Sequence, residues 1–248
     1  MSTGKAATFT AGLVQMRSGL SPQANLDAAV RLIEEATRAG ANYVLTPEMT
    51  NILEVKRERL FATIAPEEKD ATLAAFRELA RKLGIFLHVG SLAIKLLPEK
   101  AANRSFLIDR KGDIVARYDK IHMFDVELSG GESYRESRNY RPGEIGVAAD
   151  LPWGRLGLTV CYDCASPRFI ARSPRPDVRF SPSPRPSPSK PAKHIGTCLI
   201  APARSRTAPS CWRPRRAAST RTVARLSAIP LSSTLGAAFS PKATPSRA

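Results

Sequence analysis

Three reactive side chains of different chemical types lie at or just past the ends of apolar segments. Glu48 follows "NYVLTP", Lys120 follows "IVARYD" and Cys161 follows "GRLGLTV". A thiol can act as a nucleophile, a carboxylate can exchange protons and an ammonium can stabilise developing negative charge. Singly, each has an ordinary interpretation: a solvated acid, a surface charge, or a cysteine that packs as a small hydrophobe. Chemistry requires that the fold bring them together.

The elements that would position these residues alternate between strands and helices. Apolar runs predict strands, and apolar residues at helical spacing predict helices that end at Gly40 and Gly84. A turn-forming "RKGD" between two strand-like runs predicts a hairpin. The predicted strands span 8–16, 42–48, 85–94, 104–109, 114–121 and 154–163, and the predicted helices span 26–41 and 66–84.

Strand–helix–strand repeats imply parallel pairing with helical cover, and the hairpin adds antiparallel pairs. The sequence therefore predicts an α/β fold with a mixed sheet. In open α/β sheets, ligands bind outside the carboxyl ends of the strands. We therefore expect Glu48, Lys120 and Cys161 to converge at that edge.

Several motifs agree with one known family. "TPEM" with Glu48, "YDKIHMFD" with Lys120 and "GLTVCYD" with Cys161 resemble the nitrilase, or carbon–nitrogen hydrolase, superfamily in order and rough spacing. "YRES", "RPGE" and "TPEMTN" most resemble its branch of omega-amidases and deaminated-glutathione amidases. The resemblance covers about residues 8–163 and implies a four-layer α–β–β–α sandwich.

The resemblance also implies a reaction, the hydrolysis of an amide through a thioester. Cys161 would attack the carbonyl, Glu48 would move the proton, and Lys120 with the backbone N–H of Tyr162 would hold the oxyanion. Glu136, in "YRES", would orient the site, and Lys120 would favour the thiolate by lowering the thiol pKa. No cofactor or metal is expected. The substrate would be a small amide bearing a carboxylate, whose Arg or Lys partner the sequence does not assign.

Charge divides the chain at Asp163. Of 38 Lys and Arg, 22 lie in residues 1–163 against 21 acids, whereas residues 164–248 hold 16 against the single acid Asp177. Fourteen of the 20 prolines also follow Asp163. This predicts an N-terminal part of a hydrolase domain at 1–163 and a poorly ordered basic tail at 164–248. The alternative function is a nucleic-acid binder acting through that tail, although the tail lacks interleaved aromatic residues for stacking.

A frameshift accounts for this boundary. Regrouping the permitted codons by one base after Asp163 allows "LRFPALYR" and three further family-like strings, in family order. We therefore expect the sandwich to be incomplete, the family's homo-oligomer interface to be lost, and the 248-residue product to be poorly folded or inactive. The basic charge then carries no selected function.

The remaining features give weaker predictions. Cys161 and Cys164 form a lone C-x-x-C, so a redox or zinc role is a minor alternative. His88 is expected in the core, and His122 behind the site. The chain has neither a transmembrane run nor a signal-peptide pattern, which favours the cytoplasm.

Overall fold

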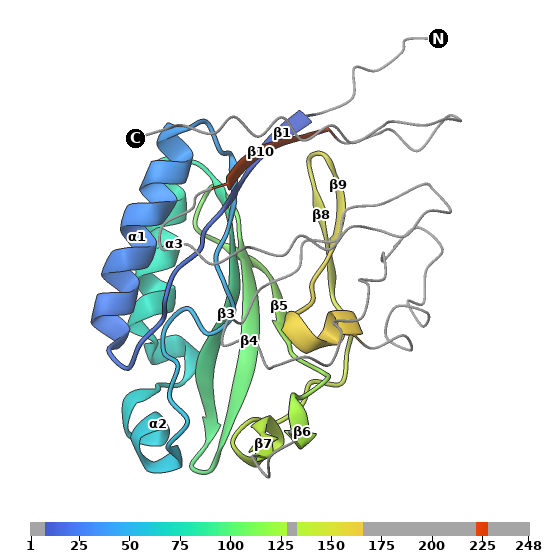
Figure 1. Cartoon of the computed structure of the whole chain (residues 1–248). Coiled ribbons are helices and arrows are strands. Elements are labelled where there is room, and N and C mark those ends of the chain that lie inside the picture. Colours follow the sequence, from blue (N-terminus) through green and yellow to red (C-terminus); the bar gives the residue numbers. More distant parts are fainter. Residues whose placement is uncertain (1–7, 128–132, 166–221, 228–248) are drawn as a thin grey trace.

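A computed structural model describes residues 8–127, 133–165 and 222–227, and its largest feature is a six-stranded sheet (Figure 1). The strand order is β10-β1-β2-β3-β4-β5. The pairs β1–β2 and β2–β3 are parallel and the others are antiparallel, which confirms the predicted mixed sheet. The strands are β1 (Thr8–Leu13), β2 (Tyr43–Leu45), β3 (Phe86–Leu97), β4 (Lys100–Ile108), β5 (Ile114–Asp119) and β10 (Thr222–Ser227).

Two long helices, α1 (Pro22–Arg38) and α3 (Ala71–Leu83), cover one face of the sheet (Figure 1). The predicted helix 66–84 begins too early. The Asp70 carboxylate accepts a hydrogen bond from Leu73 N–H at 2.8 Å and caps α3 there. The preceding residues form the short turn η1 (Glu67–Lys69), which follows the small helix α2 (Arg57–Thr63). No described helix is long and apolar enough to cross a membrane.

The opposite face of the sheet is covered by a hairpin, β8 (Ala148–Leu151) and β9 (Gly154–Gly157) (Figure 1). Leucines of the hairpin segment pack in one apolar cluster with Tyr43 and Tyr118 of the sheet. A separate cluster fills the space between the sheet and the two helices. The described residues thus provide a helical layer, a sheet and the first strands on its second face.

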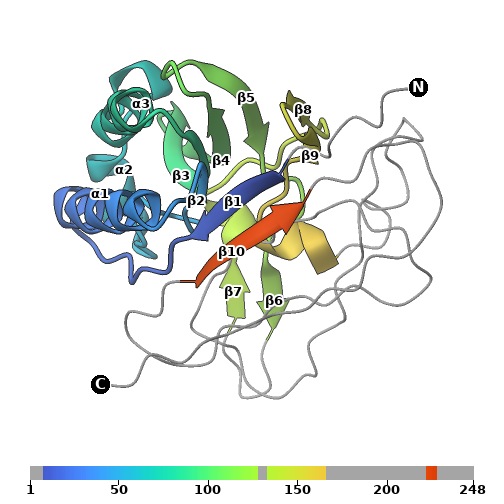
Figure 2. The same cartoon turned by 90° about the horizontal axis from the view of Figure 1, so that it is seen from above.

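Strand β10 lies antiparallel beside β1 at one edge of the sheet (Figure 2). It comes from the part of the chain predicted to be a basic tail. Apart from residues 164 and 165, the rest of that tail lies outside the described residues, and so do its predicted disorder and nucleic-acid role.

The predicted strand 154–163 is wrong in its second half. The strand β9 ends at Gly157, and Cys161 instead begins a short 3-10 helix, η3 (Cys161–Ala165). The Cys161 φ angle is 46°, a left-handed conformation that no strand contains. The apolar composition of this segment does not reveal the turn, because Leu158 and Val160 are apolar and buried, as residues of a strand would be.

Gly143 supports the end of β5 by close backbone contact. Its N–H donates to the Lys120 carbonyl at 2.8 Å, and a Cβ at this position would lie 2.3 Å from the Asp119 carbonyl oxygen. A side chain therefore cannot be added unless this segment shifts.

We predict that Gly143→Ala lowers the free energy of unfolding by about 1–3 kcal/mol, because it overpacks a backbone contact. Urea denaturation followed by circular dichroism measures the change. Gly19→Ala is the matched control, since its Cβ would have Asn25 Oδ1 as its nearest neighbour, at 3.9 Å. Equal stability of the two variants would contradict the proposed close packing.

Candidate active site

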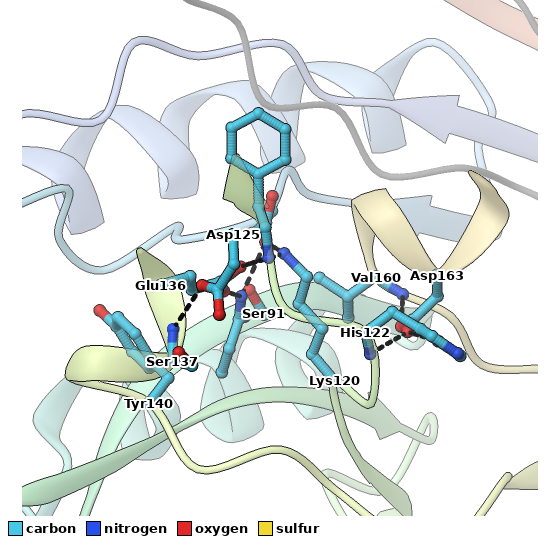
Figure 3. A network of polar contacts seen from close by, with 12 residues as sticks. Ser91, Lys120, His122, Asp125, Glu136, Ser137, Tyr140, Val160 and Asp163 are labelled. Carbon is cyan, nitrogen blue, oxygen red and sulfur yellow. Dashed lines mark hydrogen bonds and ion pairs between the residues drawn. The ribbon is translucent and has the colours of Figure 1, made fainter. Parts of the chain in front are cut away.

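A buried ammonium, that of Lys120, pairs with two buried carboxylates, of which Figure 3 labels Glu136. Lys120 Nζ lies 2.9 Å from Glu48 Oε1 and 2.8 Å from Glu136 Oε2. The three residues are at most 5% exposed. They come from the loop after β2, the end of β5 and the short turn η2 (Glu136–Arg138), so the structure brings together three of the residues predicted from sequence.

Asn103, on β4, joins the two carboxylates. Its Nδ2 donates to Glu48 Oε1 at 2.7 Å and to Glu136 Oε1 at 2.9 Å, and the residue is fully buried. These bonds hold two like charges in one pocket in addition to the bonds from Lys120. Sequence reasoning missed Asn103 because the predicted strand began at Arg104; a polar residue within the apolar "AANRSFLI" run was the available signal.

Backbone contacts fix the loops that carry these side chains. Met49, next to Glu48, has a φ of 53°, and its N–H donates to Ser91 Oγ at 2.9 Å. Lys120 N–H donates to the Asn103 carbonyl at 2.9 Å, so β4 fixes the backbone position of Lys120. Phe124 N–H donates to Glu136 Oε2 at 2.7 Å. Hydrogen bonds to strands or tight turns therefore fix the segments that carry the functional side chains.

Burial and charge act against each other in this cluster. Burial by itself would lower the pKa of Lys120, but Glu48, Glu136 and Cys161 raise it above its ordinary value, so the ammonium stays charged. Burial raises the pKa of Glu48, and the attraction of Lys120 offsets this only in part. Glu48 is therefore a carboxylate that gains a proton more readily than an exposed glutamate.

Cys161 is half-buried and packs against the apolar cluster that holds Leu158 and Val160. The charges of Glu48, Lys120 and Glu136 all act on the pKa of its thiol. Burial, followed by the negative charge of Glu48, raises the pKa of the Cys161 thiol, and Lys120 reverses only part of this. Lys120 acts in the expected direction, since it lowers the pKa of the Cys161 thiol, but burial and Glu48 outweigh it.

Aromatic rings adjoin this cluster. The ring centroids of Phe124 and Tyr162 lie 5.5 Å apart, and those of Phe124 and Tyr134 lie 5.7 Å apart. Burial, then the charges of Glu136 and Glu48, raises the pKa of Tyr134.

The two described histidines have different surroundings. His88 is buried, with Nδ1 2.7 Å from Tyr43 Oη and Nε2 2.9 Å from Ser105 Oγ, as expected for a core residue. Burial lowers the pKa of His88 to about 4, so it is neutral. His122 is half-buried and its Nδ1 lies 2.9 Å from Asp163 Oδ1. Within the described residues, no group of three or more His, Cys, Asp or Glu could hold a metal ion.

Comparison with known proteins agrees with this geometry. A family model described as carbon–nitrogen hydrolase matches residues 10–191, well over half of the chain. The chain belongs to the carbon–nitrogen hydrolase family. The match extends past Asp163, where the domain boundary was predicted.

Family members similar to this chain are named as amidases. A deaminated glutathione amidase of Yersinia enterocolitica is 39% identical over 159 residues, which are 62% of this chain and 54% of that protein. The omega-amidase NIT3 of Saccharomyces cerevisiae is 33% identical over 171 residues, 66% of this chain and 58% of that protein. The predicted nitrilase superfamily and its omega-amidase-like branch are therefore confirmed. The chain spans about half the length of the curated relatives it matches.

Solved structures confirm the nitrilase-like fold. The NitFhit protein of C. elegans has a TM-score of 0.60 and 30% identity, covering 66% of this chain and 40% of that chain. An amidase from Nesterenkonia sp. has a TM-score of 0.56 and 28% identity, covering 67% and 60%. One solved form of the Nesterenkonia amidase carries the acetamide moiety of fluoroacetamide covalently on its active-site cysteine.

We predict that Lys120→Met lowers the free energy of unfolding by about 3–5 kcal/mol near pH 8, because it leaves two buried carboxylates unpaired. The loss should shrink near pH 5. Burial already raises the folded-state pKa of Glu48 above 4.5, and loss of the cation raises it further. Between the unfolded and folded pKa values the folded state binds more protons, so stability falls as pH rises.

Urea denaturation at both pH values measures this effect. Lys82→Met is the matched control, because Lys82 forms an exposed pair with Glu34 at 3.4 Å and should contribute less than about 1 kcal/mol. A Lys120→Met loss that is small, or independent of pH, would contradict the assigned electrostatics.

Proposed function

We propose that this chain carries the active site of an amidase that hydrolyses small amides through a thioester on Cys161. One observation carries the proposal: Lys120 Nζ lies 2.9 Å from Glu48 and 2.8 Å from Glu136 in a buried cluster whose charges act on the Cys161 thiol. A nucleophile, a proton acceptor and a positive charge are thus brought into one largely buried cluster.

In the first half of the reaction, the Cys161 sulfur bonds to the substrate carbonyl carbon while its proton passes to Glu48. The raised pKa of Glu48 suits it to accept and hold that proton. The carbonyl oxygen becomes an oxyanion. When the tetrahedral intermediate collapses, the C–N bond breaks, the nitrogen takes the proton from Glu48, and ammonia leaves behind a thioester.

In the second half, water attacks the thioester carbonyl and gives a proton to Glu48. The C–S bond then breaks, the carboxylic acid departs, and the sulfur regains its proton. Lys120 and the Tyr162 N–H are proposed to stabilise the oxyanion in both halves. Glu136 is proposed to orient Lys120, since its carboxylate lies 2.8 Å from Nζ.

We further propose that the substrate is a small monoamide with a free carboxylate, acted on in the cytoplasm. The relatives named omega-amidase and deaminated glutathione amidase support this substrate class. Succinamic acid should then be hydrolysed with a lower KM than butyramide, which has the same chain length without the charge. Ammonia release measures both, and equal KM values would contradict a carboxylate clamp.

Substitutions test the assigned roles. Cys161→Ser should lower kcat/KM by about 10⁴-fold, and Glu48→Gln should lower it by about 10²–10⁴-fold, because each removes a group that acts in the bond-making step. Cys164→Ser should leave activity within about twofold in the amidase mechanism. Loss of activity on Cys164→Ser, with activity retained on Cys161→Ser, would favour a redox pair instead.

The frameshift remains a separate proposal with its own test. We expect a gene with one base inserted after the Asp163 codon to encode a more stable and more active amidase than the 248-residue chain. Sequencing the gene, together with ammonia release and thermal unfolding of both products, decides this. A fully active, stable 248-residue chain would overturn the frameshift, and an inactive frame-restored chain would overturn the amidase function.

A further inference from the structure

One fully buried carboxylate, Asp163, lies outside the Glu48–Lys120–Glu136 cluster and contacts four polar groups. Oδ2 accepts from Tyr118 Oη at 2.7 Å and from Val160 N–H at 3.0 Å. Oδ1 accepts from His122 N–H at 2.8 Å, and His122 Nδ1 lies 2.9 Å from the same oxygen. Both oxygens are thus used, each by two groups.

Two of the contacts of Asp163 close the turn that carries Cys161. The Asp163 N–H donates to the Val160 carbonyl at 3.1 Å, while the Asp163 carboxylate accepts from the Val160 N–H at 3.0 Å. Cys161 lies inside this ring with its φ of 46°. A left-handed conformation is costly for a residue with a Cβ and persists only where neighbouring contacts impose it. Asp163 supplies those contacts from both its backbone and its side chain.

The remaining contacts bracket Lys120 in the sequence. Tyr118 precedes Lys120 by two residues on β5, and His122 follows it by two residues in the next loop. Figure 3 shows Asp163 between the Val160 backbone and His122, with Lys120 on the same segment as His122. One carboxylate therefore joins the turn that bears the sulfur to both flanks of the residue that bears the ammonium.

We propose that Asp163 is a positioning residue that locks the left-handed Cys161 turn onto the Lys120 segment, and so sets the place of the sulfur beside Glu48. It touches neither the sulfur nor the ammonium in this role and acts through Val160, Tyr118 and His122. The effect of Asp163 on catalysis rests on the proposed function, whereas its effect on the ionisation of the Cys161 thiol does not.

The thiol itself reports the effect in the full 248-residue chain. Alkylation of Cys161 by iodoacetamide, localised by tandem mass spectrometry and followed against pH, gives the midpoint of thiol ionisation. In the unsubstituted chain the midpoint should lie above about 8.5, the value of a free thiol. Asp163→Asn replaces one of the two accepting oxygens by an NH2 donor, so the contacts to Val160 and Tyr118 or those to His122 lose their acceptor. The turn should then loosen and the midpoint should fall toward that free value.

A double substitution tests whether position, and not general loosening, is responsible. In the chain that keeps Asp163, Glu48→Gln should lower the pH midpoint of Cys161 by an amount equal to about a tenfold or larger change in proton concentration. In the Asp163→Asn variant, the same substitution should change it by less than about threefold. Asp70→Ala is the matched control, since it removes the buried cap of α3 and lowers stability without contacting this turn. It should leave the Cys161 midpoint unchanged under conditions where circular dichroism shows each variant folded.

If Asp163→Asn does not fold, Tyr118→Phe provides the same test, because it removes one hydrogen-bond donor to the Asp163 carboxylate. The expected downward shift of the Cys161 midpoint is then smaller. A downward shift of the midpoint supports the proposal, and no shift overturns it. The proposal is also overturned if Asp163→Asn keeps the full Glu48→Gln effect, or if Asp70→Ala shifts the midpoint as much.

Ammonia release separates this inference from the proposed function. In an active chain, Asp163→Asn should lower kcat by roughly 10²-fold with KM within about threefold, as expected for a misplaced nucleophile. Intact coupling between Glu48 and Cys161, without ammonia release from either the 248-residue chain or the frame-restored chain, would leave the positioning role in place and overturn the amidase.

Discussion

The candidate site depends on one arrangement, a single ammonium shared by two buried carboxylates. Without Lys120, Glu48 and Glu136 would be two buried carboxyl groups with no cation beside them, which is costly because desolvation of a buried charge is large. Asn103 extends the arrangement by donating to both acids. The same charges act on Cys161: burial and then Glu48 raise the pKa of its thiol, and Lys120 lowers it only in part.

Most of the helical layer and of the mixed sheet could be predicted from the sequence, because their signals are local. The apolar spacing of α1 and α3, the Gly84 stop and the "RKGD" turn each reflect a short segment. The likeness of short motifs to a known family further indicated Glu48, Lys120, Cys161 and Glu136. The structure places these four together, although their catalytic roles remain predictions.

Other features could not be predicted because they depend on contacts between distant segments. Asn103 is one polar residue in an apolar strand until the fold brings it to Glu48 and Glu136. The Cys161 turn looks like a continuation of β9, since Leu158 and Val160 are as apolar as strand residues. Only the side chain of Asp163, held by Tyr118 and His122, explains why the chain leaves the strand there.

The pairing of β10 with β1 has a consequence for how this molecule meets other chains. The backbone of Thr8–Leu13 pairs in register with β10. That strand comes from a region whose composition differs sharply from that of the rest of the chain. Main-chain pairing is largely indifferent to sequence, so an edge that accepts this strand offers the same donors and acceptors to any extended peptide. The edge at β1 is therefore where self-association by strand exchange would begin.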